Sequence, residues 1–318
     1  MSLKIIGVGK GIPKKGISNN ELADFLDTSD TWISSRTGIK NRYVCTNETL
    51  TDLSAIAAVQ AVENADLSLS DIDTIICSTI GGDYHTPSLA CCIAERIGIN
   101  CPAFDINAAC SGFIYGLEIA SGFLSSRKAK NILIICAEIL STQMDWGDRS
   151  TCVLFGDGAA ACVITEGDAL KYISLSVSAN SSMINIPAGT GNSPFIHDKA
   201  DGGFLRMQGQ EVFKFAVSTL ETEIKQALAA LKIPLDEIDY FVLHQGNKRI
   251  IDSTRTKLGQ PQDKFPINID RYGNLSSASI PLLLFEMLED GRLKTGNTVF
   301  MSAFGAGMTT GSCVFVWE

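Results

Sequence analysis

The sequence predicts an α/β protein built from two similar halves, residues 1–165 and 166–318. Near-continuous apolar runs alternate with segments of helical periodicity, a pattern typical of sheets covered by helices on both faces. Segments of the two halves also match in order at one offset of 166 residues, which indicates an internal repeat. The matching segments are 67–79 with 233–245 and 130–138 with 296–304.

Each half is predicted to contain the same elements in the same order. An acidic turn leads into a buried strand, followed by a loop, a helix, a second buried strand, a Gly-rich loop and a final strand. The Gly-rich loops and final strands lie at 155–165 and 304–316. Segment 183–203 is rich in Gly, Pro and Asn and lacks periodicity, so we expect a surface loop there.

Composition excludes several classes of protein. The 318-residue chain carries a net charge of −9, which argues against general nucleic-acid binding. No apolar run approaches the roughly 18 residues that a membrane helix needs. Ten cysteines without a pairing pattern or a secretory signal favour a reducing, cytoplasmic setting. Because there is no CxxC pair and only three histidines occur, a metal site has little support.

Cys110 is the strongest candidate for a reactive side chain. It lies between a strand-like run and a run with helical spacing, so its sulfur is expected near a helix N-terminus. The helix dipole there favours the thiolate and lowers the thiol pKa, as a covalent nucleophile requires. The alternative is a small buried hydrophobe, which suits most of the other cysteines. Under the 166-residue offset Cys110 maps onto Ser276, so two helix N-termini are expected to face one site between the halves.

His244 and Asn274 are the two further candidates for a site between the halves. His244 ends the buried run 240–244, and open α/β sheets place ligands at the carboxyl ends of strands. Its alternative is a buried histidine satisfied by a backbone group. Asn274 follows Gly273, where a turn or helix-capping role is the alternative.

With their flanking segments, Cys110, His244 and Asn274 resemble the β-ketoacyl-acyl-carrier-protein synthase III family of thiolase-type condensing enzymes. The resemblance runs through essentially the whole chain and implies a thiolase-like duplicated fold of five layers, αβαβα. The motifs that carry it are DTSDTWISSRTGI (27–39), AFDINAACSGF (103–113), DRSTCVLFGDGAAA (148–161), GQEVFKFAV (209–217), HQGNKRI (244–250), YGNLSSASIP (272–281) and AFGAG (303–307).

The resemblance implies a decarboxylating condensation that initiates fatty-acid synthesis. Cys110 would take the acyl group of an acyl-CoA, and malonyl-acyl-carrier-protein would lose carbon dioxide to give the attacking enolate. His244 Nε2 and Asn274 Nδ2 would donate hydrogen bonds to that enolate, and the backbone N–H groups of Cys110 and Ala306 would form an oxyanion hole. No metal or redox cofactor is implied, and the family is homodimeric.

The resemblance also implies substrate contacts. Trp32 would stack on the adenine of CoA, while Arg36 and Arg149 would hold its phosphates. The remaining CoA contacts would be Met207, Gly209, Phe213 and Asn247. A basic patch would attract the acidic carrier protein, although solvated surface charges are the alternative. The patch comprises Lys214, Lys248, Arg249 and Lys257.

By the same resemblance, Thr86 matches a family position whose side chain reaches across the dimer interface into the acyl pocket of the partner subunit. Since Thr86 is small, we expect a deep pocket and primers longer than acetyl, branched or of medium length.

Four positions depart from the family pattern. Ala306 stands where glycine is common and keeps its N–H group, so it serves as a donor unless a positive φ is required. Gly246 stands where alanine is usual and is expected to be benign. Met308 and Thr310 replace aromatic residues and are expected to alter the pocket shape.

Other functions fit less well. A specialised acyltransferase of secondary metabolism on the same fold is the main alternative, although the presence of Asn274 favours fatty-acid synthesis. A papain-type cysteine hydrolase shares the order Cys, His, Asn but not the local signature. A non-enzymatic carrier-binding protein would not need all three side chains. A Rossmann dehydrogenase is unsupported, because the Gly-rich 155–160 precedes a strand rather than a helix.

Overall fold

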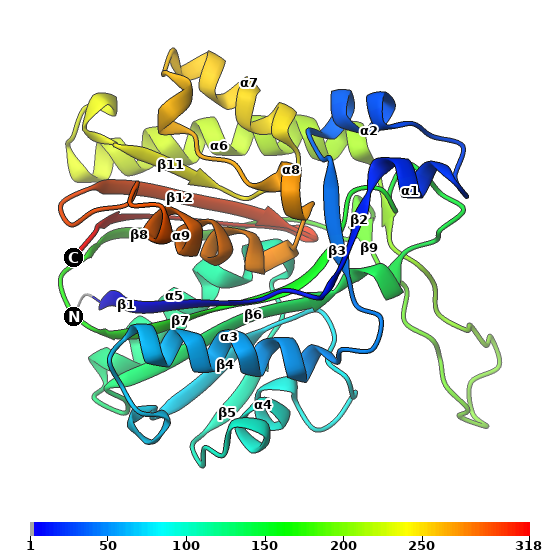
Figure 1. Ribbon diagram of the computed structural model, residues 1–318, viewed down its shortest axis with the longest axis horizontal. Helices are drawn as coiled ribbons and strands as arrows, with labels where there is room; N and C mark the ends of the chain where they lie inside the picture. Colours follow the sequence, from blue (N-terminus) through cyan, green and yellow to red (C-terminus); the bar gives the residue numbers. More distant parts are fainter. Residues whose placement is uncertain (1–2) are drawn as a thin grey trace.

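The computed structural model describes residues 3–318 and contains two sheets with helices between and outside them (Figure 1). The order of layers is αβαβα, which confirms the predicted α/β class and the five-layered duplicated fold. The first sheet has the strand order β1-β7-β6-β4-β5, and the second β11-β12-β13-β8. The first sheet's strands are β1 (Leu3–Gly11), β4 (Thr74–Ser78), β5 (Ala103–Ile106), β6 (Asn131–Ile139) and β7 (Asp157–Glu166). The second sheet's are β8 (Leu170–Asn180), β11 (Tyr240–Leu243), β12 (Thr298–Gly305) and β13 (Gly307–Val316).

Helices of each layer differ in how much of their surface is buried. The central helices α5 (Gly112–Ser125) and α9 (Ser279–Glu289) contact strands of both sheets, and every residue from 279 to 287 is buried. A helix that is apolar nearly all round suits this position. The outer helices are α3 (Leu50–Asn64) and α4 (Leu89–Ile97) on the first sheet, with α6 (Gly209–Leu231) and α7 (Lys248–Leu258) on the second.

Smaller elements surround the two sheets. They are β2 (Lys15–Ser18), α1 (Asn19–Ala23), α2 (Asp30–Thr37), β3 (Asn41–Val44), β9 (Ile184–Asn185), β10 (Arg206–Met207) and α8 (Ile269–Tyr272). Two short 3₁₀ turns, 109–111 and 276–278, precede α5 and α9. Segment 183–203 projects from the body as the yellow-green arm in Figure 1, as predicted, except that its first residues form β9 against β10.

The two halves repeat each other with one correction to the predicted register. Thr74 and Tyr240 begin equivalent strands at the offset of 166, but their partners, Ile132 and Val299, are 167 residues apart. One residue is therefore inserted between the paired strands of the second half. Ala109 and Ser276 share a positive φ of 47° and 51°. Cys110 is thus equivalent to Ser277, not Ser276. The division into domains at residue 165 remains a prediction.

The glycines of β1 allow α3 to lie directly on the first sheet. Gly7, Gly9 and Gly11 alternate along the strand, and a Cβ at any of them would overlap backbone atoms of α3. On the opposing helix, Ala57 and Ala61 are fully buried. Small residues on both sides therefore set the spacing between this strand and this helix.

We expect Gly9→Ala to lower the free energy of unfolding by about 1–3 kcal/mol, because the new methyl group must displace α3. The matched control is Gly122→Ala, since a Cβ at Gly122 in α5 meets no atom within 4 Å. Helix propensity predicts that this control stabilises the protein by about 0.5–1 kcal/mol. Urea denaturation measures both values, and equal effects of the two substitutions would contradict the packing argument.

Candidate active site

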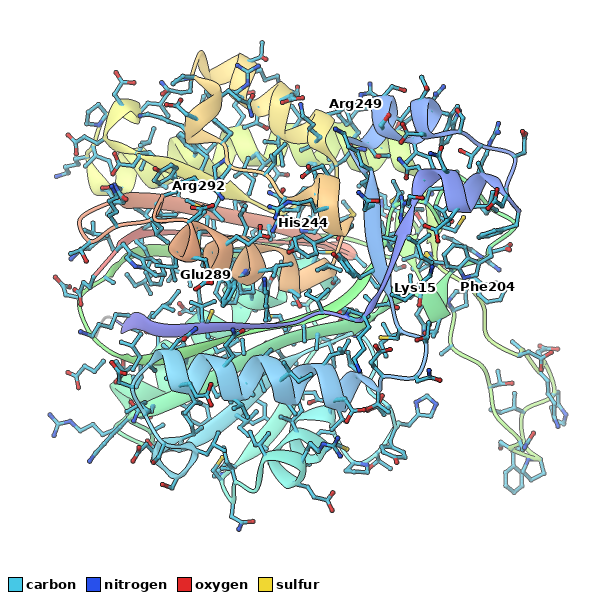
Figure 2. The ribbon with its side chains drawn as sticks, viewed as in Figure 1. Lys15, Phe204, His244, Arg249, Glu289 and Arg292 are labelled. Carbon is cyan, nitrogen blue, oxygen red and sulfur yellow. The ribbon has the colours of Figure 1, made fainter. Side chains whose placement is uncertain are left out.

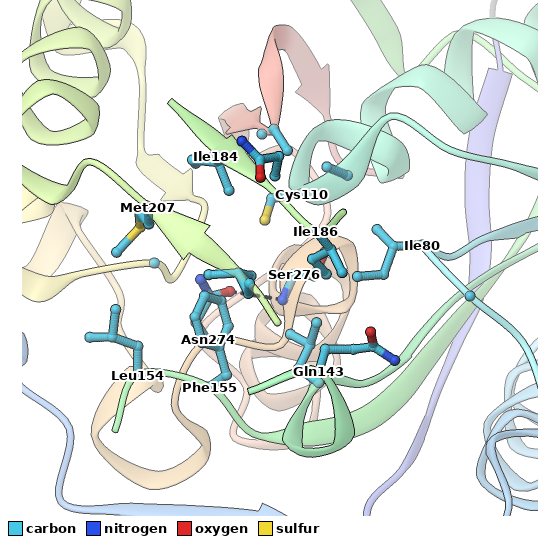
Figure 3. A pocket seen from close by; sticks show the side chains of 18 of the residues that line it. Ile80, Cys110, Gln143, Leu154, Phe155, Ile184, Ile186, Met207, Asn274 and Ser276 are labelled. Carbon is cyan, nitrogen blue, oxygen red and sulfur yellow. Dashed lines mark hydrogen bonds between the residues drawn. The ribbon is translucent and has the colours of Figure 1, made fainter. Parts of the chain in front are cut away.

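A cavity of about 2260 Å³ opens between elements of both halves and contains the three predicted catalytic residues. Cys110, His244 and Asn274 all line it, and Figure 3 shows Cys110 and Asn274 on facing segments. Figure 2 shows His244 near the centre of the molecule and Arg249 close to its rim. The structure therefore brings together side chains that are 134 and 30 residues apart in the sequence.

Cys110 lies in the 3₁₀ turn between β5 and α5. The β12–β13 turn passes directly against its backbone: a Cβ at Gly305 would lie 2.7 Å from the Cys110 nitrogen. This close approach requires glycine at 305 and places Ala306 beside Cys110 in the cavity wall. Ala306 does not have a positive φ, so alanine fits there without strain.

The pKa of the Cys110 thiol corrects the expectation drawn from its helix N-terminus. Burial raises this pKa to about 12, and the nearby Glu138 carboxyl adds to the rise. A hydrogen bond with the Ser276 side chain acts in the opposite direction without reversing it. Because α5 begins two residues later, at Gly112, the enclosed position outweighs the helix dipole, and the resting sulfur is a neutral thiol.

His244 follows β11 and is held by one hydroxyl group. Its Nδ1 lies 2.8 Å from Ser279 Oγ, and its ring meets Phe304 edge-on at 5.4 Å. Burial lowers the His244 pKa to about 4, so the ring is neutral at pH 7. Ser279 Oγ can donate to Nδ1 or accept from it, since the Ser276 carbonyl 2.9 Å away offers the hydroxyl a second acceptor. Nε2 can therefore either accept or donate while Nδ1 stays paired.

Asn274 has its amide orientation fixed by its neighbours. Its Oδ1 accepts the backbone N–H of Ser276 at 2.8 Å, which leaves Nδ2 for the cavity (Figure 3). The Asn274 N–H donates to the Leu154 carbonyl at 2.9 Å. A Cβ at Gly246 would lie 2.9 Å from His244 Nε2 and 3.7 Å from Asn274 Nδ2, so both nitrogens border the same space. The turn alternative for Asn274 fits as well, because its amide oxygen accepts from the N–H two residues later, whereas the residue that caps the 3₁₀ turn 276–278 is Leu275.

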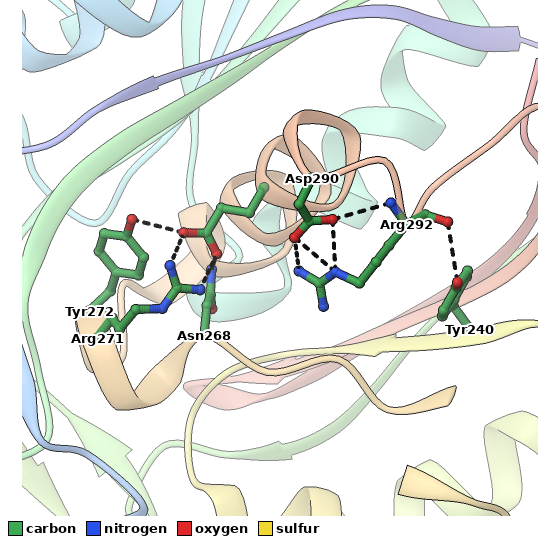
Figure 4. Close-up of polar contacts among 7 residues, drawn as sticks. Tyr240, Asn268, Arg271, Tyr272, Asp290 and Arg292 are labelled. Atoms are coloured by element: carbon green, nitrogen blue, oxygen red, sulfur yellow. Dashed lines mark hydrogen bonds and ion pairs between the residues drawn. The ribbon is translucent and has the colours of Figure 1, made fainter. Parts of the chain in front are cut away.

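The loop that leads to Asn274 is anchored by a buried carboxylate on α9. Glu286 accepts two hydrogen bonds from Arg271, at 2.6 and 2.7 Å, and one from Tyr272 Oη at 2.8 Å (Figure 4). It also accepts from Asn268 Nδ2, and the Asn268 backbone N–H donates to Gln245 Oε1. This network ties the loop before Asn274 to the residue that follows His244.

Most predicted substrate contacts lie at the cavity. The lining includes Trp32, Arg36, Met207, Gly209, Phe213, Lys214, Asn247, Arg249 and Ala306. The guanidinium groups of Arg36 and Arg149 lie 4.5 and 5.1 Å from the Trp32 ring. Arg149, which does not itself line the cavity, also pairs with Asp27.

Other predicted residues lie outside the cavity lining. These are Thr86, Lys248, Lys257, Met308 and Thr310. Met308 and Thr310 are buried beside the cavity-lining residues Ala306 and Thr309, so their effect on the pocket shape remains a prediction. The lysines of the proposed basic patch pair with acids: Lys214 with Glu211, Lys248 with Asp252, and Lys257 with Glu221. Within residues 3–318, Arg249 forms no ion pair and lies 5.5 Å from the Phe213 ring.

Glu138 is a buried carboxyl near Cys110 that the sequence reasoning missed, although it does not itself line the cavity. It is the last residue but one of β6, and its carboxyl accepts hydrogen bonds from the Ile80 backbone and the Thr79 hydroxyl. Burial raises its pKa to about 8, opposed by hydrogen bonds from Ile80, Ser276 and Thr79. The sequence does contain a sign of this residue, because Glu138 is an acidic residue inside the apolar run 131–139. Acidic side chains are seldom fully buried unless they have partners.

The structure predicts how Glu138 changes stability with pH. The carboxyl ionises near 4.5 in the unfolded chain and near 8 in the folded protein, so the unfolded state loses its proton first. Wild type should lose stability relative to Glu138→Gln as the pH rises through this window. We expect the difference between pH 5 and pH 8 to exceed about 1.4 kcal/mol, the equivalent of one pKa unit, in urea denaturation. Glu289→Gln, an exposed control, should show no such trend.

No cluster of three or more His, Cys, Asp or Glu side chains in residues 3–318 has an arrangement that could hold a metal. Over the same residues, no helix combines the length and apolar character needed to cross a bilayer. The ten cysteines are all free thiols, with no disulfide in the described part of the chain.

Comparison with known proteins shows which family has this sequence and fold. A family model described as 3-oxoacyl-[acyl-carrier-protein (ACP)] synthase III matches residues 104–181, and the model of its C-terminal part matches 228–317. The chain is 43% identical to the beta-ketoacyl-[acyl-carrier-protein] synthase III of Clostridium acetobutylicum, an alignment that covers 99% of each chain.

Solved structures of related proteins support the same family assignment. The 3-oxoacyl-[acyl-carrier-protein] synthase III of Aquifex aeolicus VF5 superimposes with a TM-score of 0.92 at 39% identity, covering 99% of this chain and 100% of its own. The priming β-ketosynthase of the R1128 polyketide pathway also superimposes with a TM-score of 0.92, at 30% identity over 100% of this chain and 96% of its own. Identity this high over the full length is decisive: the chain belongs to the β-ketoacyl-acyl-carrier-protein synthase III family of condensing acyltransferases.

Proposed function

We propose that this enzyme condenses a primer acyl group, carried on Cys110, with malonyl-acyl-carrier-protein, and so initiates fatty-acid synthesis. The observation that supports this most is the meeting of one thiol and two nitrogen groups at one cavity: Cys110 Sγ, His244 Nε2 and Asn274 Nδ2. The first group suits acyl transfer, and the other two suit stabilisation of an enolate.

In acyl transfer, the Cys110 sulfur attacks the thioester carbonyl of an acyl-CoA. Because the thiol is neutral at rest, its proton leaves as the new S–C bond forms, and His244 Nε2 accepts it while Nδ1–H donates to Ser279. The backbone N–H groups of Cys110 and Ala306 stabilise the tetrahedral oxyanion. Its collapse breaks the bond to the CoA sulfur, which takes the proton from His244 and departs as CoA thiol.

In condensation, the malonyl thioester oxygen accepts hydrogen bonds from Asn274 Nδ2 and His244 Nε2. Before this step, proton exchange with solvent moves the ring proton from Nδ1 to Nε2, and Ser279 Oγ then donates to Nδ1. The bond to the carboxylate breaks, carbon dioxide leaves, and the electron pair forms the enolate. The enolate carbon then attacks the acyl carbonyl on Cys110. The bond to sulfur breaks, the thiolate takes up one proton from solvent, which is the proton that the decarboxylation consumes overall, and the β-ketoacyl-carrier product is released. Both neutral donors belong to buried side chains, where hydrogen bonds to developing charge are strong.

Trp32, Arg36 and Arg149 are proposed to bind the CoA nucleotide, since Trp32 and Arg36 line the cavity and both guanidinium groups lie against the Trp32 ring. Met207, Gly209, Phe213 and Asn247 would line the pantetheine path. For the carrier protein, Arg249 is the best candidate because it lines the cavity and no acid neutralises it within the described residues. Lys214 lines the same cavity but pairs with Glu211. Lys248 and Lys257 are weaker candidates, because each is paired with an acid.

We also propose a homodimer in a reducing, cytoplasmic setting. Strand β5 lies at the edge of its sheet and is only partly buried, so a second copy can pair with it along this edge. Ten free thiols suit a reducing compartment. Thr86 lies outside the cavity of its own chain, which fits a role in the acyl pocket of the partner.

Cys110→Ala should abolish acylation. Incubation with acyl-CoAs of increasing length, followed by intact-protein mass spectrometry, should add the mass of one acyl group to wild type and nothing to the variant. The matched control is Cys91→Ala, which removes an exposed thiol and should leave acylation unchanged. An adduct that persists in Cys110→Ala would refute the nucleophile assignment.

The same series tests the role of Thr86. C4–C8 primers should acylate the enzyme faster than acetyl-CoA does. Equal or faster reaction of acetyl-CoA would refute the deep-pocket expectation while leaving the role of Cys110 intact.

Asn274→Asp isolates the condensation step. The aspartate keeps an oxygen for the Ser276 N–H but loses the Nδ2 donor. We expect acylation of Cys110 to survive and carbon dioxide release from malonyl-carrier protein to fall by about 10²–10³-fold, the usual effect of losing one such donor. Asn192→Asp, at the edge of the cavity, makes the same chemical change without this role. Decarboxylation at the wild-type rate in Asn274→Asp would exclude Asn274 as an enolate donor.

A further inference from the structure

The largest fully buried side chain of the protein is an arginine without a counter-ion. Arg42, in β3, is 0% exposed. Its guanidinium donates to Asn19 Oδ1 at 2.7 Å and to the Val153 carbonyl at 2.8 Å, while Nε has no partner. No carboxylate of residues 3–318 pairs with it. Burial lowers its pKa to about 10, so the group remains charged at pH 7. Burying a charge without a counter-ion lowers the stability of the folded protein. A contribution to stability alone therefore does not explain why an arginine occupies this position.

Through its Nη1 hydrogen bond to Asn19, Arg42 is connected to α2, the helix of the proposed nucleotide site. Asn19, itself 1% exposed, accepts from Arg42 through Oδ1 and donates through Nδ2 to Asp30 Oδ1 and to the Ile39 carbonyl, each at 2.8 Å. Asp30 is the first residue of α2, the helix that carries Trp32 and Arg36. Arg42 thus fixes the start of α2 through a single buried amide.

Through its Nη2 hydrogen bond to Val153, Arg42 is also connected to Asn274. Val153, which accepts from Arg42, is followed by Leu154, whose carbonyl accepts the Asn274 N–H. Two residues further on, the Gly156 N–H donates to the Asn274 carbonyl at 3.1 Å. The stem of Arg42 also fills the crossing of these segments, since added Cβ atoms at Gly156 and Gly273 would lie 3.3 and 3.5 Å from its own Cβ.

We propose that Arg42 is a positioning residue that sets both the nucleotide-binding helix α2 and the enolate donor Asn274 from one buried guanidinium. This inference rests on the proposed function. A planar fork of donors reaches two acceptors on different segments at once, whereas a lysine ammonium in the same place is a point charge that can serve only one of them well. The residue touches neither substrate, so its effect is transmitted through Asn19 and Val153.

The connections from Arg42 to α2 and to Asn274 can be tested separately, because acylation by acyl-CoA reports on α2 and decarboxylation of malonyl-carrier protein reports on Asn274. Arg42→Lys and Arg42→Met should raise KM for acyl-CoA in acylation and also slow carbon dioxide release from malonyl-carrier protein, each by roughly 10- to 100-fold, the effect of a displacement of about 1 Å. Asp30→Ala breaks only the connection to α2, at an exposed position. It should raise KM for acyl-CoA and leave decarboxylation at the wild-type rate. Circular dichroism and thermal melting, measured on every variant, establish that the proteins compared are folded.

Folded Arg42 variants that release carbon dioxide at the wild-type rate would overturn the proposal. A loss of decarboxylation in Asp30→Ala equal to that in Arg42→Lys would also overturn it, because the two connections would not be separable. If both Arg42 variants fail to fold, Asp30→Ala still tests the connection from Arg42 to α2. An unchanged KM for acyl-CoA in this variant would refute that connection and with it the proposal. Failure of wild type in both half-reactions would instead refute the proposed function.

Discussion

The catalytic geometry depends on the two halves meeting at the first turns of their central helices. The 3₁₀ turns before α5 and α9 contact each other, and Ser78 Oγ donates to Ser277 Oγ across the junction at 3.0 Å. A side chain at Gly112 would collide with Ser78, so the contact requires glycine at the first residue of α5. Because of this contact, the thiol of one half lies in the same cavity as the imidazole and amide of the other.

A second consequence of this arrangement is that the reacting groups are neutral. Burial keeps the Cys110 proton on sulfur and the His244 ring uncharged, and it holds the pKa of Glu138 near 8. The negative charge that develops on the substrate oxygens meets oriented amide, imidazole and backbone donors, while His244 carries the transferred proton only during acyl transfer. Such donors need no reorganisation when the charge forms, which is the main advantage of an enclosed polar site.

Much of this could be predicted from the sequence, because it depends on local patterns. The strand-to-helix junction at Cys110 and the end of the apolar run at His244 are both visible in a few consecutive residues. The register was wrong by one residue in the later strands, since an insertion between them leaves no mark in a short match. The pKa of Cys110 was also mispredicted, because a local pattern shows the helix but not how deeply the sulfur is enclosed.

Contacts between distant segments explain what was missed. Lys257 pairs with Glu221, which lies 36 residues earlier, and Arg42 reaches a carbonyl 111 residues away. Composition cannot reveal such partners, and backbone acceptors carry no sequence signal at all. The papain-type alternative, by contrast, depended only on the order of three residues and is excluded by the fold and the family.

The enclosed, protonated sulfur has a consequence for the redox chemistry of the protein. Alkylating agents and peroxides attack thiolates, so a thiol whose pKa is about 12 reacts slowly with them at neutral pH. Cys91, by contrast, is exposed on the surface of the single chain. Mild oxidation of the chain should therefore modify its exposed thiol before it modifies the nucleophile.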